Sequence, residues 1–167
     1  MSDAAIRRAA EIIFSEGWDL VKFYFNIGLP TETKDDVRGI VDRAHEVMAI
    51  AKQKGRHRAR INLSTSEFVP KPFTPFQWLP MAPREETLEK ISLIKHSLRD
   101  RAITYKYHDL DQSIVECAMS RGDRSLAPVI ERAWKAGCEF DGWHDRFNMK
   151  TWLKAFEDEG VDMAPFV

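Results

Sequence analysis

A glycine and a carboxylate flank the point where a predicted strand gives way to a helix. The segment reads FNIGLPTET over residues 25–33. Gly28 has no side chain, so a ligand could approach the backbone there, and Glu32 would lie favourably beside the start of the helix. The same residues would also build a simple tight turn in which Thr33 caps the helix. Ligands of parallel α/β proteins bind at the carboxyl ends of strands, so the segment is a candidate ligand site, and both interpretations stay open.

Polar side chains also share one face of the next predicted strand. Asn62, Ser64 and Ser66 alternate with mostly apolar residues, as in a strand with one polar face. Inside a barrel these groups would need hydrogen-bond partners. A bound polar ligand and the polar groups of neighbouring strands would serve equally well. The pattern therefore predicts either a ligand-binding surface or an internally satisfied polar layer.

A proline-rich stretch, VPKPFTPFQWLP over residues 69–80, follows that strand. Its prolines exclude a helix or a central strand, and its aromatic residues argue against a flexible linker. Prolines also lower the entropy cost of fixing a loop. We therefore predict an ordered loop in which Phe73, Phe76 and Trp78 pack against the carboxyl-end face of the sheet.

Metal-ligating residues are sparse. Cys117 and Cys138 are the two cysteines of the chain, too few for a disulfide framework or a four-cysteine metal site. His108 and His144 lie in different segments without the spacing of metal ligands. The sequence predicts two reduced core thiols and no metal site.

Hydrophobic periodicity predicts an alternating order of helices and strands. The predicted helices cover residues 3–16, 33–55, 83–100, 109–120, 126–137 and the surroundings of 152–156, and the predicted strands cover 19–28, 61–66 and 103–107. Few polar residues interrupt the first strand, which predicts burial on both of its faces. Strands separated by helices favour a parallel α/β sheet, so the strands ending near Gly28 and Ser66 should be parallel neighbours. Three strands do not close a barrel, so we expect this chain to be part of something larger.

The composition is that of a globular chain without a strong charge. Of the 167 residues, 44% are hydrophobic, enough for a core, and the formal net charge of −1 gives no global attraction for nucleic acid or membranes. A basic cluster over residues 52–60 could contact RNA phosphates or form a solvated loop. Because no apolar run is long enough for a membrane span or a signal peptide, we expect a cytoplasmic location.

The two strand-end segments and the tail together resemble the radical S-adenosylmethionine enzymes. IGLPTET over 27–33 and FVPKPFTPFQW over 68–78 look like the ends of the fifth and sixth strands of that family's partial barrel. SRGDR over 120–124 and FDGW over 140–143 resemble the tail of a bacterial subfamily whose full-length members also carry a cobalamin-binding-like domain. The resemblance covers the chain roughly from Ala4 to Phe156.

The resemblance implies an α/β fold with parallel strands. Residues 1–108 would be the C-terminal portion of a partial (β/α) TIM-like barrel, and residues 109–167 would be a helical C-terminal tail. In the family's pattern Gly28 matches cleanly, whereas Glu32 is displaced by one position. The residues implied on the cofactor side are Ile27, Gly28, Leu29, Glu32, Asn62 and Ser64, and those on the substrate side are Lys71, Phe73 and Trp78.

The chain lacks the Cys-x3-Cys-x2-Cys triplet with which that family holds a four-iron four-sulfur cluster. In the family, a preceding barrel section supplies the triplet, so this section, in the same or a separate chain, is the implied partner. S-adenosylmethionine and the cluster are thus cofactors of the full-length enzyme, whose substrate is unidentified. This chain alone is expected to bind neither stably, to have no catalytic residue and to be inactive. A rival interpretation is a stand-alone module that binds a protein or RNA through residues 69–80 or 52–60.

Overall fold

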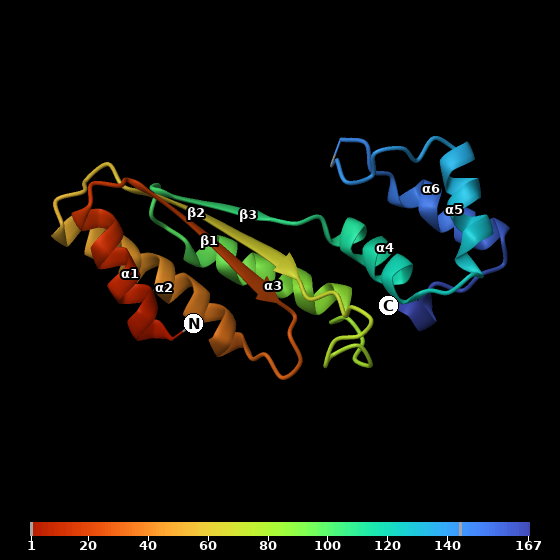
Figure 1. The fold of residues 1–167 in the computed structure, drawn as a ribbon, viewed down its shortest axis with the longest axis horizontal. Helices are drawn as coiled ribbons and strands as arrows, with labels where there is room; N and C mark the ends of the chain where they lie inside the picture. Colours follow the sequence, from red (N-terminus) through yellow and green to blue (C-terminus); the bar gives the residue numbers. More distant parts are fainter. Residues whose placement is uncertain (1, 144) are drawn as a thin grey trace. The chain divides into compact units, whose positions relative to one another are not determined.

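The structure, a computed structural model, describes residues 2–143 and 145–167 (Figure 1). Its elements, in chain order, are α1 (Asp3–Ser15), β1 (Leu20–Ile27), α2 (Lys34–Gln53), β2 (Arg60–Glu67), α3 (Arg84–Ser97), β3 (Ile103–Tyr107), α4 (Leu110–Arg121), α5 (Leu126–Lys135), α6 (Met149–Asp158) and the short 3-10 helix η1 (Ala164–Phe166). The elements predicted from periodicity are therefore present, with small differences at their ends.

The chain divides into two compact units. The α/β unit comprises the residues up to Ser66 together with Pro83–Tyr107, and the helical unit comprises Glu67–Ala82 together with His108–Val167. The division expected from the sequence, at residue 108, kept the 67–82 loop with the strands. The structure groups that loop with the helical tail instead.

A parallel sheet forms the centre of the α/β unit. Over the described residues it has three strands in the order β1-β2-β3. In the register of β2 and β3, Ile61 lies opposite Ile103 and Thr65 lies opposite Tyr107. The prediction that the first two strands are parallel neighbours is confirmed, as is the α/β class.

The helices of this unit lie on one side of the sheet (Figure 1). Apolar side chains of α1, α2 and α3 pack there against Ile61 and Leu63, both fully buried. The other side of β1 is open, since exposed residues alternate along the strand with more buried ones. The prediction that β1 is buried on both faces is therefore wrong. Leu20 and Tyr24 look like core residues in the sequence, but they are 47% and 75% exposed, because helices cover a single face.

Two local signals fix the ends of α2. The hydroxyl of Thr33 accepts a hydrogen bond from the N–H of Asp36, and the Asp36 carboxylate accepts one from the N–H of Thr33. This reciprocal pair is a capping box. At the other end Gly55 has a φ of 72°, a left-handed conformation that glycine adopts without strain.

The helical unit has its own core. Buried side chains of α4, α5 and α6 form it, among them Val129, Trp152 and Phe156. The thiol of Cys117 donates to the carbonyl of Phe166, and the N–H of Met81 donates to the carbonyl of Val167. These contacts attach both η1 and the end of the 67–82 loop to the helical unit.

Candidate functional site

The turn after β1 combines a glycine, a carboxylate and a strained threonine. Gly28 and Thr31 both have left-handed backbones, with φ of 78° and 69°. The N–H of Gly28 donates to Oε1 of Glu32 at 2.9 Å, and the N–H of Glu32 donates to the carbonyl of Leu29 at 3.0 Å. A positive φ is costly for a β-branched residue such as threonine. The hydrogen bonds made by Glu32 therefore help to hold the turn in a conformation that Thr31 disfavours.

A lysine of α3 is buried against this turn. Nζ of Lys90 lies 2.9 Å from Oε1 of Glu32, and their side chains are 5% and 7% exposed. Nζ of Lys90 also lies 2.7 Å from Oε1 of Glu86. Burial by itself would lower the pKa of Lys90, but the hydrogen bonds to Glu86 and Glu32 outweigh it and raise the pKa. Lys90 is therefore a buried cation held between two carboxylates.

A hollow of about 550 Å³ opens beside the turn. Asn26, Leu29, Thr31 and Glu32 line it, together with residues of α1 and of the N-terminal half of α2. Most of the charged residues around it are acidic; Arg43 is the basic residue among those that line it. The hollow gives room for a ligand next to the strand end that the sequence singled out.

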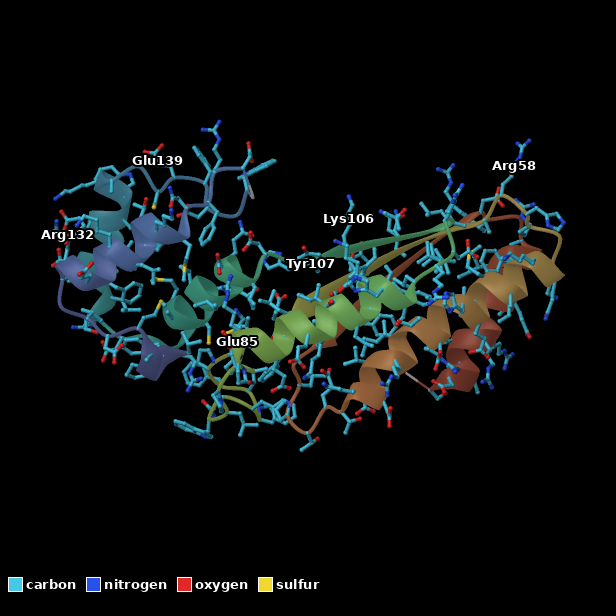
Figure 2. All side chains as sticks on the ribbon, turned by 180° about the vertical axis from the view of Figure 1, so that it is seen from behind. Arg58, Glu85, Lys106, Tyr107, Arg132 and Glu139 are labelled. Atoms are coloured by element: carbon cyan, nitrogen blue, oxygen red, sulfur yellow. The ribbon has the colours of Figure 1, made fainter. Side chains whose placement is uncertain are left out.

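The face of the sheet turned away from the helices carries polar side chains beside the exposed Leu20 and Tyr24. Asn26, Asn62 and Ser66 are exposed, and Ser64 is half-buried. The hydroxyl of Ser66 donates to Oδ1 of Asn26 at 2.8 Å and so links β1 with β2. Lys106 of β3 also points away from the helices (Figure 2). The open face thus offers amide, hydroxyl and ammonium groups, one pair of which is satisfied between neighbouring strands.

The residues predicted on the cofactor side fall into three environments. Ile27 is fully buried and belongs to the core of the α/β unit. Leu29, which is 38% exposed, and Glu32 line the hollow. Asn62 and Ser64 belong to β2 and lie along the open face. Leu29 is therefore an apolar side chain of the turn that is accessible to a ligand.

The residues predicted on the substrate side all lie in the 67–82 loop. Nζ of Lys71 pairs with Oε1 of Glu116 and donates to the hydroxyl of Ser120 at 3.1 Å. Phe73 and Trp78 are 97% and 83% exposed, so the prediction that their rings pack against a surface is wrong.

The physical reason lies in how the loop turns. The N–H of Phe73 donates to the side-chain oxygen of Gln77, and the hydroxyl of Thr74 donates to the carbonyl of Lys71. Phe73 itself has a φ of 63°. The loop is thus fixed through its backbone, which leaves the two rings outside. Among the residues that the structure describes, Phe76 is the one of the three predicted rings that meets another ring, that of Phe68, edge-on at 5.8 Å.

The two thiols do not resemble cluster ligands. Cys117 is buried and Cys138 is half-buried, and burial raises the pKa of both. A raised pKa keeps a thiol protonated, whereas cluster ligation needs thiolates. Among the described residues, no three His, Cys, Asp or Glu side chains gather as a metal site would require. His144 lies outside the described residues.

The basic cluster lies in the connection between α2 and β2. Lys52 pairs with Asp100 at 3.3 Å, and Arg56 pairs with Asp19 at 2.8 Å. Arg58 projects from the same end of the α/β unit, at the amino end of β2 (Figure 2). Acidic neighbours thus neutralise two of these cations. In the part of the chain that the structure describes, no helix has the length and apolar character needed to cross a membrane.

Sequence reasoning missed Lys90 and Asn26. Lys90 was hidden because it lies on a predicted helix surface, where a lysine normally reaches solvent. Its spacing from Glu86 is the one signal available, since residues four apart on a helix form ion pairs. Asn26 alternates with Phe25 and Ile27, which in retrospect places it on the polar face of β1.

Comparison with known proteins gives one informative similarity. No known protein-family profile and no solved structure matches the chain. The chain is similar to an uncharacterised protein of Methanocaldococcus jannaschii, with 26% identity over 160 residues. The match covers 93% of this chain but 33% of the relative, so the chain spans about a third of the length of that protein.

Proposed function

We propose that this chain is the C-terminal part of the partial (β/α) barrel of a radical S-adenosylmethionine enzyme, followed by its helical tail. In this proposal β1 and β2 present the cofactor-side residues, and the 67–82 loop lies on the substrate side. When bound to a reduced four-iron cluster, S-adenosylmethionine supplies a deoxyadenosyl radical. The cluster ligands belong to a barrel section outside these residues.

The open polar face of the sheet is the observation that carries the proposal. A parallel sheet is ordinarily covered on both faces, and its strands then read as continuous apolar runs. Here the helices cover one face, while Asn26, Asn62 and Ser66 are exposed on the other. In a (β/α) barrel the helices lie outside, the other face of the strands turns inward, and sites lie at the carboxyl ends of the strands, where polar groups could meet a ligand.

The residues at the strand ends suit part of the cofactor. Leu29 is an accessible apolar side chain that could pack against adenine, and Asn62 and Ser64 could hydrogen-bond its polar groups. The cluster is different, because burial raises the pKa of the Cys117 and Cys138 thiols and the two lie on separate segments. These residues do not fit the cluster, and no step of its chemistry is assigned to them.

The similarity to a longer protein supports the same proposal. The match covers 33% of the relative, so the rest of that protein is long enough to supply the other strands of a barrel. The proposal therefore requires that the unmatched part of the Methanocaldococcus jannaschii relative carry a Cys-x3-Cys-x2-Cys segment. Its absence from that sequence would remove the main support for a radical mechanism.

A hybrid protein gives the direct test. The hybrid is the Methanocaldococcus jannaschii relative with its matched segment replaced by this chain. After anaerobic reconstitution with iron and sulfide, we expect it to show the spectrum of a four-iron cluster and to release 5′-deoxyadenosine from S-adenosylmethionine with dithionite. The 167-residue chain treated in the same way should do neither. A stoichiometric cluster on the chain alone, lost on replacing Cys117 and Cys138 by alanine, would overturn the proposal.

A binding module is the second candidate, because Phe73 and Trp78 are so exposed. Exposed aromatic rings are typical of surfaces that bind another protein. The hybrid separates the two functions, since a binding module has no reason to support cleavage of S-adenosylmethionine. If the full-length relative cleaves the cofactor and the hybrid, folded and loaded with its cluster, does not, the binding module is the better account.

A further inference from the structure

The turn after β1 is held by one backbone hydrogen bond and by a side-chain support. Thr31 has a φ of 69°, and a left-handed backbone at a β-branched residue persists only where the surroundings impose it. The N–H of Glu32 donates to the carbonyl of Leu29 at 3.0 Å, which closes the turn around Thr31. This bond does not reach Gly28, which has a φ of 78° and whose N–H is bound by the side chain of Glu32 instead.

Glu32 supplies one half of the support. Its Oε1 accepts the N–H of Gly28 at 2.9 Å and lies 2.9 Å from Nζ of Lys90. A single carboxylate oxygen thus joins the first residue of the turn to a residue of α3. With a side chain that is 7% exposed, Glu32 has little water to replace a lost partner.

Lys90 supplies the other half. Its ammonium group is what makes a buried carboxylate acceptable at this position, because an unpaired charge there would turn toward solvent or take up a proton. The first change would move Oε1 away from the N–H of Gly28, and the second would weaken the hydrogen bond between them, because a neutral carboxyl accepts less strongly than a carboxylate. Glu86, 2.7 Å from Nζ, keeps the lysine itself charged and in place.

We propose that Lys90 is a positioning residue, which through Glu32 fixes the turn from Gly28 to Thr31 so that Leu29 faces the ligand hollow. The assignment of the ligand rests on the proposed function, whereas the fixing of the turn does not. Lys90 contacts no ligand in this proposal and acts on the site only through Glu32.

The chain offers a matched control for this lysine. Lys34 pairs with Glu89 at 3.1 Å and, like Lys90, joins the start of the α2 region to α3. The side chains of Lys34 and Glu89 are 67% and 65% exposed, so the pair differs from Lys90–Glu32 chiefly in burial. Lys34→Met therefore removes a cation between the same elements without touching the turn.

Amide hydrogen exchange of the full chain tests the fixing of the turn. In Lys90→Met the N–H of Gly28 should exchange more than about tenfold faster, while the amides of Ile61 and Leu63 change much less. Lys34→Met should leave Gly28 unchanged, and Lys90→Arg should restore most of its protection. If Lys90→Met accelerates the exchange of all amides of the α/β unit equally, Lys90 stabilises the unit as a whole and does not fix the turn in particular. If the exchange of the Gly28 amide is unchanged, Lys90 and the turn are not coupled. If Lys90→Met does not fold, Lys90→Gln, which also removes the cation but keeps a polar side chain, gives the same comparison.

The hybrid protein tests the link to the ligand. Lys90→Met in the hybrid should raise the KM for S-adenosylmethionine by about tenfold and leave kcat within about threefold, because it disturbs binding rather than bond cleavage. Lys34→Met should change neither constant. An unsubstituted hybrid that cleaves no S-adenosylmethionine would overturn the proposed function while the exchange result at Gly28 still stood. A hybrid that is active and indifferent to Lys90→Met would overturn the positioning role alone.

Discussion

The turn after β1 and the loop after β2 are both strand-end segments, but their charged anchors differ. Lys90 and Glu32 hold the first with side chains that are 5% and 7% exposed. Lys71 and Glu116 hold the second with side chains that are 44% and 49% exposed. When a buried ion pair loses one partner, the other charge stays buried without compensation, whereas at the surface water takes the place of the lost partner.

Their apolar side chains differ in the same sense. In the first segment Ile27 is fully buried, and Leu29 is partly exposed beside a hollow. In the second, Phe73 and Trp78 lie almost entirely in solvent. The first segment is therefore complete within its own unit, while the second presents surface for something else to cover.

The largest effect should come from breaking the buried pair. Lys90→Met leaves Glu32 without its counter-charge, and we expect a loss of about 3 kcal/mol in the free energy of unfolding of the α/β unit. Lys71→Met should cost the helical unit less than about 1 kcal/mol, because its pair is half in water. Urea unfolding read through the exchange of slow amides in β2 and α4 measures each unit by itself.

The pH dependence of the stability lost in Lys90→Met has a definite sign. Because the pKa of Lys90 is raised above its ordinary 10.5, its contribution is fully present below that value and is lost only as the pH rises through the raised pKa. The destabilisation of Lys90→Met relative to the parent should therefore not shrink as the pH rises from about 6 to 9. A difference that shrinks within this range would mean that Lys90 is not the buried cation described.

A smaller effect is expected at the cap that follows the first turn. Thr33→Ala removes the hydroxyl that accepts from the N–H of Asp36, at a cost of about 1 kcal/mol. Hydrogen bonds from the hydroxyl and the N–H of Thr33 lower the pKa of Asp36, so its contribution is present above 3.8 and is lost as the pH falls through the lowered pKa. In the variant the pKa of Asp36 should move toward its ordinary value, as NMR titration would show. Asn148→Ala, at the cap of α6, is the control and should leave Asp36 unchanged.

Each strand-end segment also contains one non-glycine residue with a left-handed backbone. Thr31→Gly relieves strain but adds chain entropy, and we expect a net gain of roughly 0.5 kcal/mol. Phe73→Gly should gain less, because phenylalanine is not β-branched and tolerates a φ of 63° better. Thermal unfolding of both variants measures the difference. A clear loss at Thr31 would mean that its side chain contributes contacts that outweigh the strain.

The features around the two strand-end segments also differ in how far the sequence could predict them. The cap at Thr33 and the helix end at Gly55 depend on neighbouring residues, so local patterns predicted both. The order of helices and strands likewise predicted the parallel sheet. The Glu32–Lys90 pair joins distant parts of the chain, and no local pattern indicates which lysine of a helix is buried.

Two of the wrong predictions share a cause. Tyr24 and its apolar neighbours suggested a strand buried on both faces, and the aromatic residues of the 67–82 loop suggested a packed surface. Both predictions equate an apolar type of side chain with a buried one, although much of a protein's surface is apolar. Residue type sets the preference for burial, but a side chain is buried only where another part of the protein covers the face on which it lies.

The smallest effect on stability, and the sharpest test of the second segment, concerns its exposed rings. Phe73→Ser and Trp78→Ser should each change the stability of the chain by less than about 0.5 kcal/mol, because rings in solvent make few contacts to lose. Phe76→Ser is the matched contrast and should cost about 1 kcal/mol through its edge-on contact with Phe68.

In the hybrid protein the expectation for Phe73 and Trp78 changes, since a loop on the substrate side should be covered by the completed barrel. Thermal unfolding of the hybrid should then show a loss for Phe73→Ser and Trp78→Ser that the chain alone does not show. Equal, negligible effects in both proteins would leave these rings free for a separate partner and would favour the binding module.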